Sequence, residues 1–138
     1  MSAADSFLDT NIFVYAVDNN YPEKQKIARK LISELTKNDK AVLSTQVLQE
    51  FYNIATKKMG ISKEKARAII DSLIPVRTID TTREIVVNAI EINIKYQFSI
   101  WDSLVLSAAK SGGCTRIYTE DLNSGEIVEG VEIINPFA

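Results

Sequence analysis

Short apolar segments alternate with longer amphipathic segments along most of this chain. The short segments hold too few residues for helices and suit buried strands, whereas the longer ones repeat apolar residues every three or four positions, as helices with one buried face do. This alternation is typical of an α/β protein whose mostly parallel sheet is covered by helices on both faces. We expect strands at residues 6–8, 41–43, 76–79, 116–119 and 131–134.

Residues that favour helix ends set the boundaries of the predicted helices. Pro22 suits the first turn of a helix with Ile27 in its buried stripe. Gly60 ends a helix that begins near residue 45 and runs through residue 59. Thr81 and Glu84 have the spacing of a capping box and open a later helix. Further helices are expected at residues 12–17, 63–73 and 99–111.

Length and composition limit the class of protein. With 138 residues and 46% apolar content, the chain is most simply one domain, residues 1–138, that buries a core without disulfides. It has a single cysteine, Cys114, and no apolar run near the roughly 20 residues that span a bilayer. We therefore expect a cytoplasmic protein with no membrane segment.

Two acidic residues directly follow predicted strands. Asp9 closes the first strand and precedes Thr10 and Asn11, which favour a helix start, and Asp121 follows the fourth strand. The carboxyl ends of parallel strands open on one edge of a sheet, where ligands bind in α/β proteins. Each acid also has a local interpretation, Asp9 as a turn or capping residue and Asp121 as part of the turn before Asn123.

Two more acidic residues can reach the same edge. Glu50 borders the buried face of its helix, so its carboxylate needs a partner, which Lys57 or Lys58 could supply. Asp102 lies three residues after Ser99 in the first turn of another helix, where it could complete a cap. If the four carboxylates share a partly buried pocket, they repel one another and demand a cation.

The absence of histidine narrows the chemistry. It excludes Ser-His-Asp and Cys-His nucleophile systems and leaves carboxylates, a metal, lysine or tyrosine. A pocket of carboxylates alone suits Mg²⁺ or Mn²⁺ and disfavours zinc. Such ions activate water and stabilise charge on phosphoryl groups, which indicates phosphodiester hydrolysis. Thr10, Asn11 and Thr119 are suited to orient the carboxylates or metal-bound waters.

Charge is distributed unevenly along the chain. The net charge of −2 argues weakly against a nucleic-acid partner. A basic run nevertheless fits either a solvated helix face or a surface that guides a polyanion towards an acidic, metal-loaded centre. This run contains Lys57, Lys58, Lys63, Lys65 and Arg67.

Four segments together resemble the successive motifs of PIN-domain ribonucleases, and the likeness is greatest to the small VapC-type toxins. The resemblance covers essentially the whole chain, in order and at suitable spacing. The segments are residues 7–13, residues 44–52 around Glu50, residues 101–105 and residues 118–122.

This resemblance implies a three-layer αβα sandwich and Mg²⁺- or Mn²⁺-dependent endoribonuclease activity. It also implies a homodimer, and a separate antitoxin whose tail can block the acidic pocket. In the family pattern the functional acid follows the threonine by two residues, which favours Asp121 over its neighbour Glu120. By motif position the acidic quartet is Asp9, Glu50, Asp102 and Asp121, with Asn11 and Thr119 in support.

Two other functions remain open at the level of sequence. Phosphatases and receiver domains also place an aspartate at the first strand end and transfer phosphoryl groups through it, although Asn11 stands where a further acid is informative. A non-catalytic RNA-binding or partner-binding module is the third hypothesis. The sequence does not specify which RNA is recognised, because recognition of loop shape leaves no linear code.

Overall fold

A six-stranded sheet forms the centre of the structure, a computed structural model that describes residues 5–138. The strand order is β3-β2-β1-β4-β6-β5, and every pairing is parallel except that of β5 with β6. The strands are β1 (Ser6–Leu8), β2 (Ala41–Ser44), β3 (Arg77–Ile79), β4 (Arg116–Tyr118), β5 (Ile127–Val128) and β6 (Val131–Ile134).

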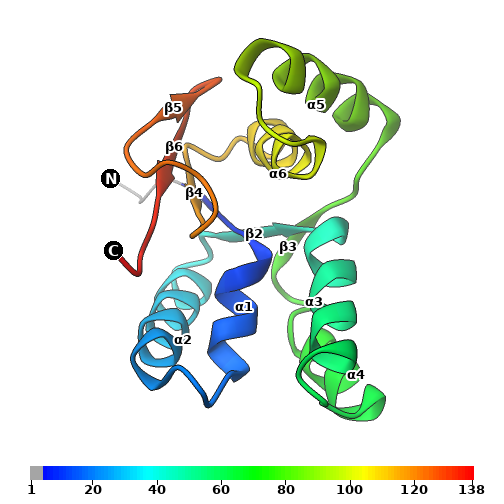
Figure 1. The fold of residues 1–138 in the computed structure, drawn as a ribbon, viewed down its shortest axis with the longest axis vertical. Helices are drawn as coiled ribbons and strands as arrows, with labels where there is room; N and C mark the ends of the chain where they lie inside the picture. Colours follow the sequence, from blue (N-terminus) through cyan, green and yellow to red (C-terminus); the bar gives the residue numbers. More distant parts are fainter. Residues whose placement is uncertain (1–4) are drawn as a thin grey trace.

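Helices cover both faces of this sheet (Figure 1). On one face lie α1 (Thr10–Val17), α2 (Pro22–Lys37), α3 (Thr45–Lys57) and α4 (Lys63–Ser72). On the other face α5 (Arg83–Tyr96) packs against α6 (Ile100–Ser111). The predicted α/β fold with a mostly parallel, helix-flanked sheet is confirmed. No helix in the described part of the chain is long and apolar enough to cross a membrane.

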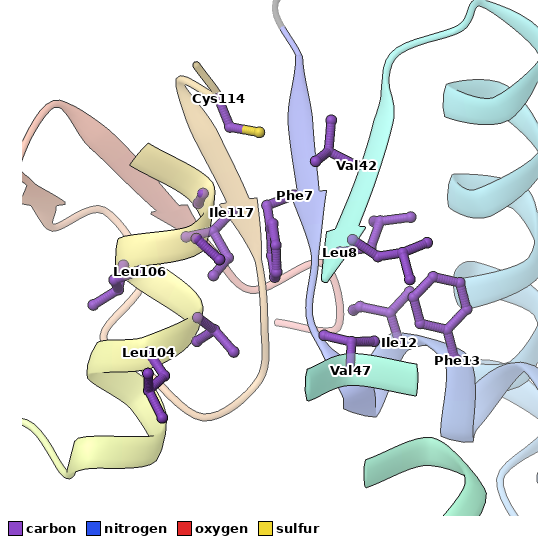
Figure 2. Close-up of a cluster of buried hydrophobic side chains, with 14 of the residues drawn as sticks. Phe7, Leu8, Ile12, Phe13, Val42, Val47, Leu104, Leu106, Cys114 and Ile117 are labelled. Carbon is purple, nitrogen blue, oxygen red and sulfur yellow. The ribbon is translucent and has the colours of Figure 1, made fainter. Parts of the chain in front are cut away.

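The hydrophobic core explains why β1 and β2 contain consecutive apolar residues. Phe7 and Leu8 are both fully buried, because helices cover the two faces towards which successive side chains of a strand point. Figure 2 shows Leu104 and Leu106 of α6 on one side of β1, and Ile12 of α1 on the other. Burying each such side chain contributes about 1.5–3 kcal/mol.

Hydroxyl side chains cap several of the helices. Ser44 caps α3, Ser62 caps α4 and Ser99 caps α6, in each case by accepting a hydrogen bond from a backbone N–H in the first turn. The capping box predicted from Thr81 and Glu84 is wrong by one residue. Thr82 is the cap of α5, and its hydroxyl accepts from the N–H of residue 85.

Other details also differ from the sequence prediction, among them the start of α1, which was expected at residue 12 and lies at Thr10. The third helix ends at Lys57 and not at residue 59. Ile27 was expected in the buried stripe of α2, but it is 37% exposed and Ala28 is buried in its place. The two-residue strand β5 was not predicted, because it is stabilised by antiparallel pairing with β6 and not by an apolar pattern of its own.

Candidate active site

One pocket at the carboxyl edge of the sheet contains all four of the acids predicted from the sequence. Its volume is about 570 Å³, within the range of ligand-binding clefts. Residues of α1 and α3 line it, together with the start of α6 and the segment after β4. Asp9, Glu50, Asp102 and Asp121 all contribute to its wall.

Strand register places Asp9 beside Thr119. Leu8 of β1 is paired with Tyr118 of β4, so the residues that follow the two strands are neighbours. The Asp9 carboxylate accepts a hydrogen bond from the Thr119 hydroxyl at 2.8 Å and another from the Thr10 N–H at 2.7 Å. Asp9 is therefore both the cap of α1, as the local interpretation held, and a wall of the pocket.

Burial dominates the electrostatics of Asp9. The residue is only 5% exposed, and burial raises the pKa of its carboxyl from 3.8 to about 7. Hydrogen bonds from Thr119 and Thr10 oppose this rise in pKa, whereas the charges of Asp121 and Glu50 add to it. A cation in the pocket would reverse the balance, because it favours the ionised carboxylate.

Asn11 connects Asp121 to the end of β4. Its side-chain amide donates to the Asp121 carboxylate at 3.2 Å and to the Thr119 hydroxyl at 3.3 Å. Its amide oxygen accepts from the Glu120 N–H at 3.3 Å, so both the nitrogen and the oxygen of the amide have partners. The Thr119 hydroxyl also accepts from the Asp121 N–H at 3.1 Å, so Asn11 and Thr119 hold two of the four acids.

Glu120 points in a different direction from Asp121. Its carboxylate accepts from Lys24 at 2.5 Å and from the Tyr15 hydroxyl at 2.7 Å. Burial alone raises the pKa of Glu120, but these two partners outweigh it and the net pKa is lowered. Only Asp121 of these two acids lines the pocket.

Glu50 is held by polar neighbours and not by a lysine. Its carboxylate accepts from the Thr10 hydroxyl and from the Gln46 amide, each at 3.2 Å. The predicted partners Lys57 and Lys58 form no ion pair with it among residues 5–138. The alternative interpretation of Glu50 as a paired surface acid is therefore wrong.

Gln46 was missed by the sequence analysis. It is 8% exposed, and besides Glu50 its amide contacts the backbone carbonyl of Trp101 at 3.4 Å. Gln46 thus connects α3 to the first turn of α6, next to Asp102. Its position four residues before Glu50, on the same face of a helix, was the available signal.

Ser99 is the cap of α6, and Asp102 lies in the first turn of this helix. The Ser99 hydroxyl accepts from the Asp102 N–H at 3.1 Å, and the Asp102 side chain lines the pocket. Burial raises the pKa of the Asp102 carboxyl, the charge of Asp121 adds to the rise, and Ser99 partly offsets it. The pocket therefore contains two carboxyls with raised pKa values.

The predicted basic run divides into two groups. Lys58 lines the acidic pocket and, with Lys65, an adjoining groove of about 850 Å³. Arg67 pairs with Asp71 at 3.2 Å, and Lys57 and Lys63 are exposed, as on a solvated helix face.

The donor set fits a hard divalent cation in kind. All four acidic side chains, and the neighbouring hydroxyl and amide groups, offer oxygen atoms. Within residues 5–138, no three acidic or cysteine side chains come close enough together to enclose an ion by themselves. Mg²⁺ does not require this, because it usually keeps several waters and binds through one or two carboxylates plus substrate phosphates.

Fold and pocket together define the class: a small α/β protein with an acidic site at the carboxyl edge of a parallel sheet. The model of the PIN domain family matches residues 6–127, and the chain therefore belongs to the PIN domain family. The resemblance inferred from the four sequence motifs is confirmed. No curated protein matches the chain in sequence.

Several solved structures share the fold. A toxin–antitoxin complex from Klebsiella pneumoniae has 15% identity and a TM-score of 0.70, over 96% of this chain and 98% of the other. VapC20 of Mycobacterium tuberculosis, described as a sarcin-ricin loop cleaving toxin, has 20% identity and a TM-score of 0.69, over 91% and 98%. DNA-bound VapBC from Salmonella typhimurium has 20% identity and a TM-score of 0.69, over 95% and 97%.

Proposed function

We propose that this protein is an endoribonuclease that depends on Mg²⁺ or Mn²⁺ and acts as the toxin of a toxin–antitoxin pair. The observation that carries the proposal is the gathering of four carboxylates, with no histidine in the chain, in one pocket of a PIN-family fold. The solved structures similar in fold include a toxin described as cleaving RNA at the sarcin-ricin loop.

The chain's own residues prepare the site for phosphodiester hydrolysis. Thr119 and the Thr10 N–H fix the Asp9 carboxylate, and Asn11 fixes that of Asp121. Lys58 supplies positive charge on the wall of the same pocket, where it can attract a phosphate group. The residues that would hold the cation are Asp9, Glu50, Asp102 and Asp121; a bound Mg²⁺ or Mn²⁺ would activate water and neutralise charge on the phosphoryl group.

Asn11 disfavours the aspartyl-phosphate alternative. It stands where a further acid is informative for that chemistry, and its amide donates to Asp121. Acid-stable labelling of Asp9 by a phosphodonor would instead favour that alternative. The non-catalytic module is distinguished by calorimetry. If titration to millimolar Mg²⁺ and Mn²⁺ detects no binding, this hypothesis moves ahead of the nuclease.

Cleavage of structured RNA tests the proposal directly. Purified protein is incubated with transfer RNA and ribosomal RNA in Mg²⁺, in Mn²⁺ and in EDTA, and compared with Asp9→Asn and Asp102→Asn. Asp80→Asn is the matched control, because Asp80 is exposed and lies outside the lining of the acidic pocket. We expect cleavage only by the wild type and the control, and only with metal; full activity of both site variants would disprove the proposal.

The proposal includes a homodimer in the cytoplasm and a separate antitoxin as partner. Three apolar side chains of α5 support self-association: Val87 is 51% exposed, Ile90 45% and Ile94 67%. They share one face of the helix, and exposed apolar patches of this kind commonly mark protein interfaces. Light scattering after gel filtration should give twice the mass of the chain, and Ile90→Glu should reduce it to the monomer mass.

A further inference from the structure

Two exposed aromatic side chains line the pocket that contains the four acids. Trp101 is 65% exposed and Tyr21 is 51% exposed. They mark the two ends of α1. Trp101 is connected through Gln46 and Glu50 to Thr10 in the first turn of this helix, whereas Tyr21 follows its last turn. The acids lie at the first of these ends, because Asp9 caps α1, Thr10 donates to Glu50 and Asn11 donates to Asp121. A helix of eight residues spans about 12 Å, so Trp101 lies beside the acids and Tyr21 lies at the far end of the same pocket.

The Tyr21 ring is held in place from one side. Tyr15 packs edge to face against it with the ring centroids 5.6 Å apart, and the Lys24 ammonium lies 5.9 Å from the centroid of Tyr21. Tyr15 is itself fixed by the hydrogen bond to Glu120 and by ring contact with Phe137 at 4.9 Å. Tyr21 is therefore orientated before any ligand arrives, and half of its surface remains open.

Trp101 has an anchored backbone and an open side chain. Its carbonyl accepts from Gln46, and the next residue, Asp102, donates its N–H to Ser99. The indole has no ring partner among the described residues. An exposed aromatic ring on a fixed backbone is suited to stacking, because little conformational freedom is lost when a flat ligand binds.

Lysine side chains line a groove that adjoins this pocket. Lys58 lines the acidic pocket and the adjoining groove, and it forms no ion pair within residues 5–138. The groove is also lined by Lys65 and the amides of Asn19 and Asn20. A path of cations and polar groups beside aromatic rings matches the backbone and the bases of a single strand.

We propose that Trp101 and Tyr21 are stacking sites for unpaired RNA bases, Trp101 beside the acids and Tyr21 further along the same pocket. This inference rests on the proposed nuclease function and names the side chains that hold the unpaired bases of its RNA substrate. In a duplex both faces of each base are covered by neighbouring pairs, so paired RNA cannot occupy the two rings. Tyr52 and Phe98 do not line this pocket.

The only tryptophan of the chain reports on this binding. The Asp9→Asn variant in Mg²⁺ is titrated with oligoadenylate, with oligouridylate and with an RNA duplex of equal length, and the fluorescence of Trp101 is followed. Stacked bases quench indole emission, so we expect saturable quenching by the single strands and at most a small change with the duplex. Equal quenching by duplex and single strand contradicts the inference.

Variants then assign the two stacking sites. Trp101→Ala and Tyr21→Ala should each weaken binding of the single strand, measured by fluorescence anisotropy of labelled RNA, by about 5- to 150-fold. Trp101→Phe and Tyr21→Phe should retain most of the affinity, because an aromatic face remains. Ile74→Ala is the matched control, since Ile74 is 74% exposed and lies outside the pocket.

The outcomes separate this inference from the proposed function. Unchanged RNA affinity in both alanine variants overturns the stacking sites, even if the enzyme cleaves RNA. Unchanged RNA affinity together with altered mass in light scattering assigns the two rings to a protein interface instead. Quenching that is specific for single strands, without any cleavage in Mg²⁺ or Mn²⁺, supports the stacking sites and disproves the nuclease. Circular dichroism verifies that each variant is folded.

Discussion

Replacing Asp9 with asparagine should stabilise the metal-free protein above neutral pH. The two side chains are nearly equal in size, so the substitution removes charge without creating a cavity. The rise in the pKa of Asp9 from 3.8 to about 7 corresponds to about 4 kcal/mol, at about 1.4 kcal/mol for each pKa unit. Because burial is the main cause, the folded protein bears this cost when the carboxyl ionises.

Asparagine does not recover the whole of that free energy. The Thr119 hydroxyl donates to Asp9 and already accepts from Asn11 and from the Asp121 N–H. In the variant, an asparagine amide nitrogen that faces the Thr119 hydroxyl cannot accept its proton, so one hydrogen bond is lost. This loss lowers the free energy of unfolding by about 1–3 kcal/mol. We expect the Asp9→Asn variant to exceed the wild type by about 1–3 kcal/mol in free energy of unfolding at pH 8 in EDTA.

The direction of the pH dependence follows from the raised pKa. Between about pH 4 and pH 7 the folded protein keeps a proton on Asp9 that the unfolded chain has lost, so the stabilisation is complete below pH 4. This stabilisation is lost as the pH rises through about 7, and the contribution of Asp9 to the free energy of unfolding changes little above that pH. Relative to the Asp9→Asn variant, the wild type should lose about 3 kcal/mol between pH 5 and pH 8.

Urea unfolding followed by circular dichroism measures this difference. Wild type, Asp9→Asn and the exposed control Asp80→Asn are unfolded at pH 5 and pH 8 in EDTA, and the free energies are compared in pairs. Using differences cancels the titration of all the other groups. If wild type and Asp9→Asn show the same pH dependence, the burial argument for Asp9 is refuted.

Three further predictions test other parts of the structure. Millimolar Mg²⁺ or Mn²⁺ should raise the melting temperature of the wild type at pH 8 and leave that of Asp9→Asn nearly unchanged; equal shifts in scanning fluorimetry would count against Asp9 as a ligand. Gln46→Met should raise the Mn²⁺ concentration for half-maximal cleavage by about 2- to 10-fold, because Glu50 loses a donor, whereas the exposed Gln49→Met should not. Burial raises the pKa of the Cys114 thiol to about 12, so at pH 8 Ellman's reagent should label it only in urea; rapid labelling of the native protein would contradict its burial.

Much of the fold could be predicted because it is encoded in local patterns. Consecutive apolar residues such as Phe7 and Leu8 of β1 arise where both faces of the sheet are covered. Ser44 and Ser99 start helices by accepting bonds from residues three positions later. The exposed Ile27 shows the limit of this approach. A periodic stripe indicates one face of a helix, but only the packing of α2 decides which residue of that face is buried.

The part of the candidate site that follows the parallel strands could be predicted, because these strands end at one edge of the sheet. Asp9 and Asp121 could be placed there from their positions after two strands, before any contact was known. Glu50 and Gln46 show what could not be obtained in this way. Their shared helix face is local, but Thr10 and Trp101, to which they are bonded, come from other elements.

The sequence by itself determined the alternation of strands and helices, the family, and an acidic centre without histidine, because these depend on residue types and their spacing. The family pattern already favoured Asp121 over Glu120, but only the tertiary structure shows the physical reason for this difference between two adjacent residues. Lys24 and Tyr15, which lie 96 and 105 residues before Glu120, donate hydrogen bonds to its carboxylate outside the pocket. Asn11 donates to the carboxylate of Asp121, which lines the pocket. Such choices depend on charges and hydrogen bonds between distant segments, which exist only once the sheet has brought those segments together.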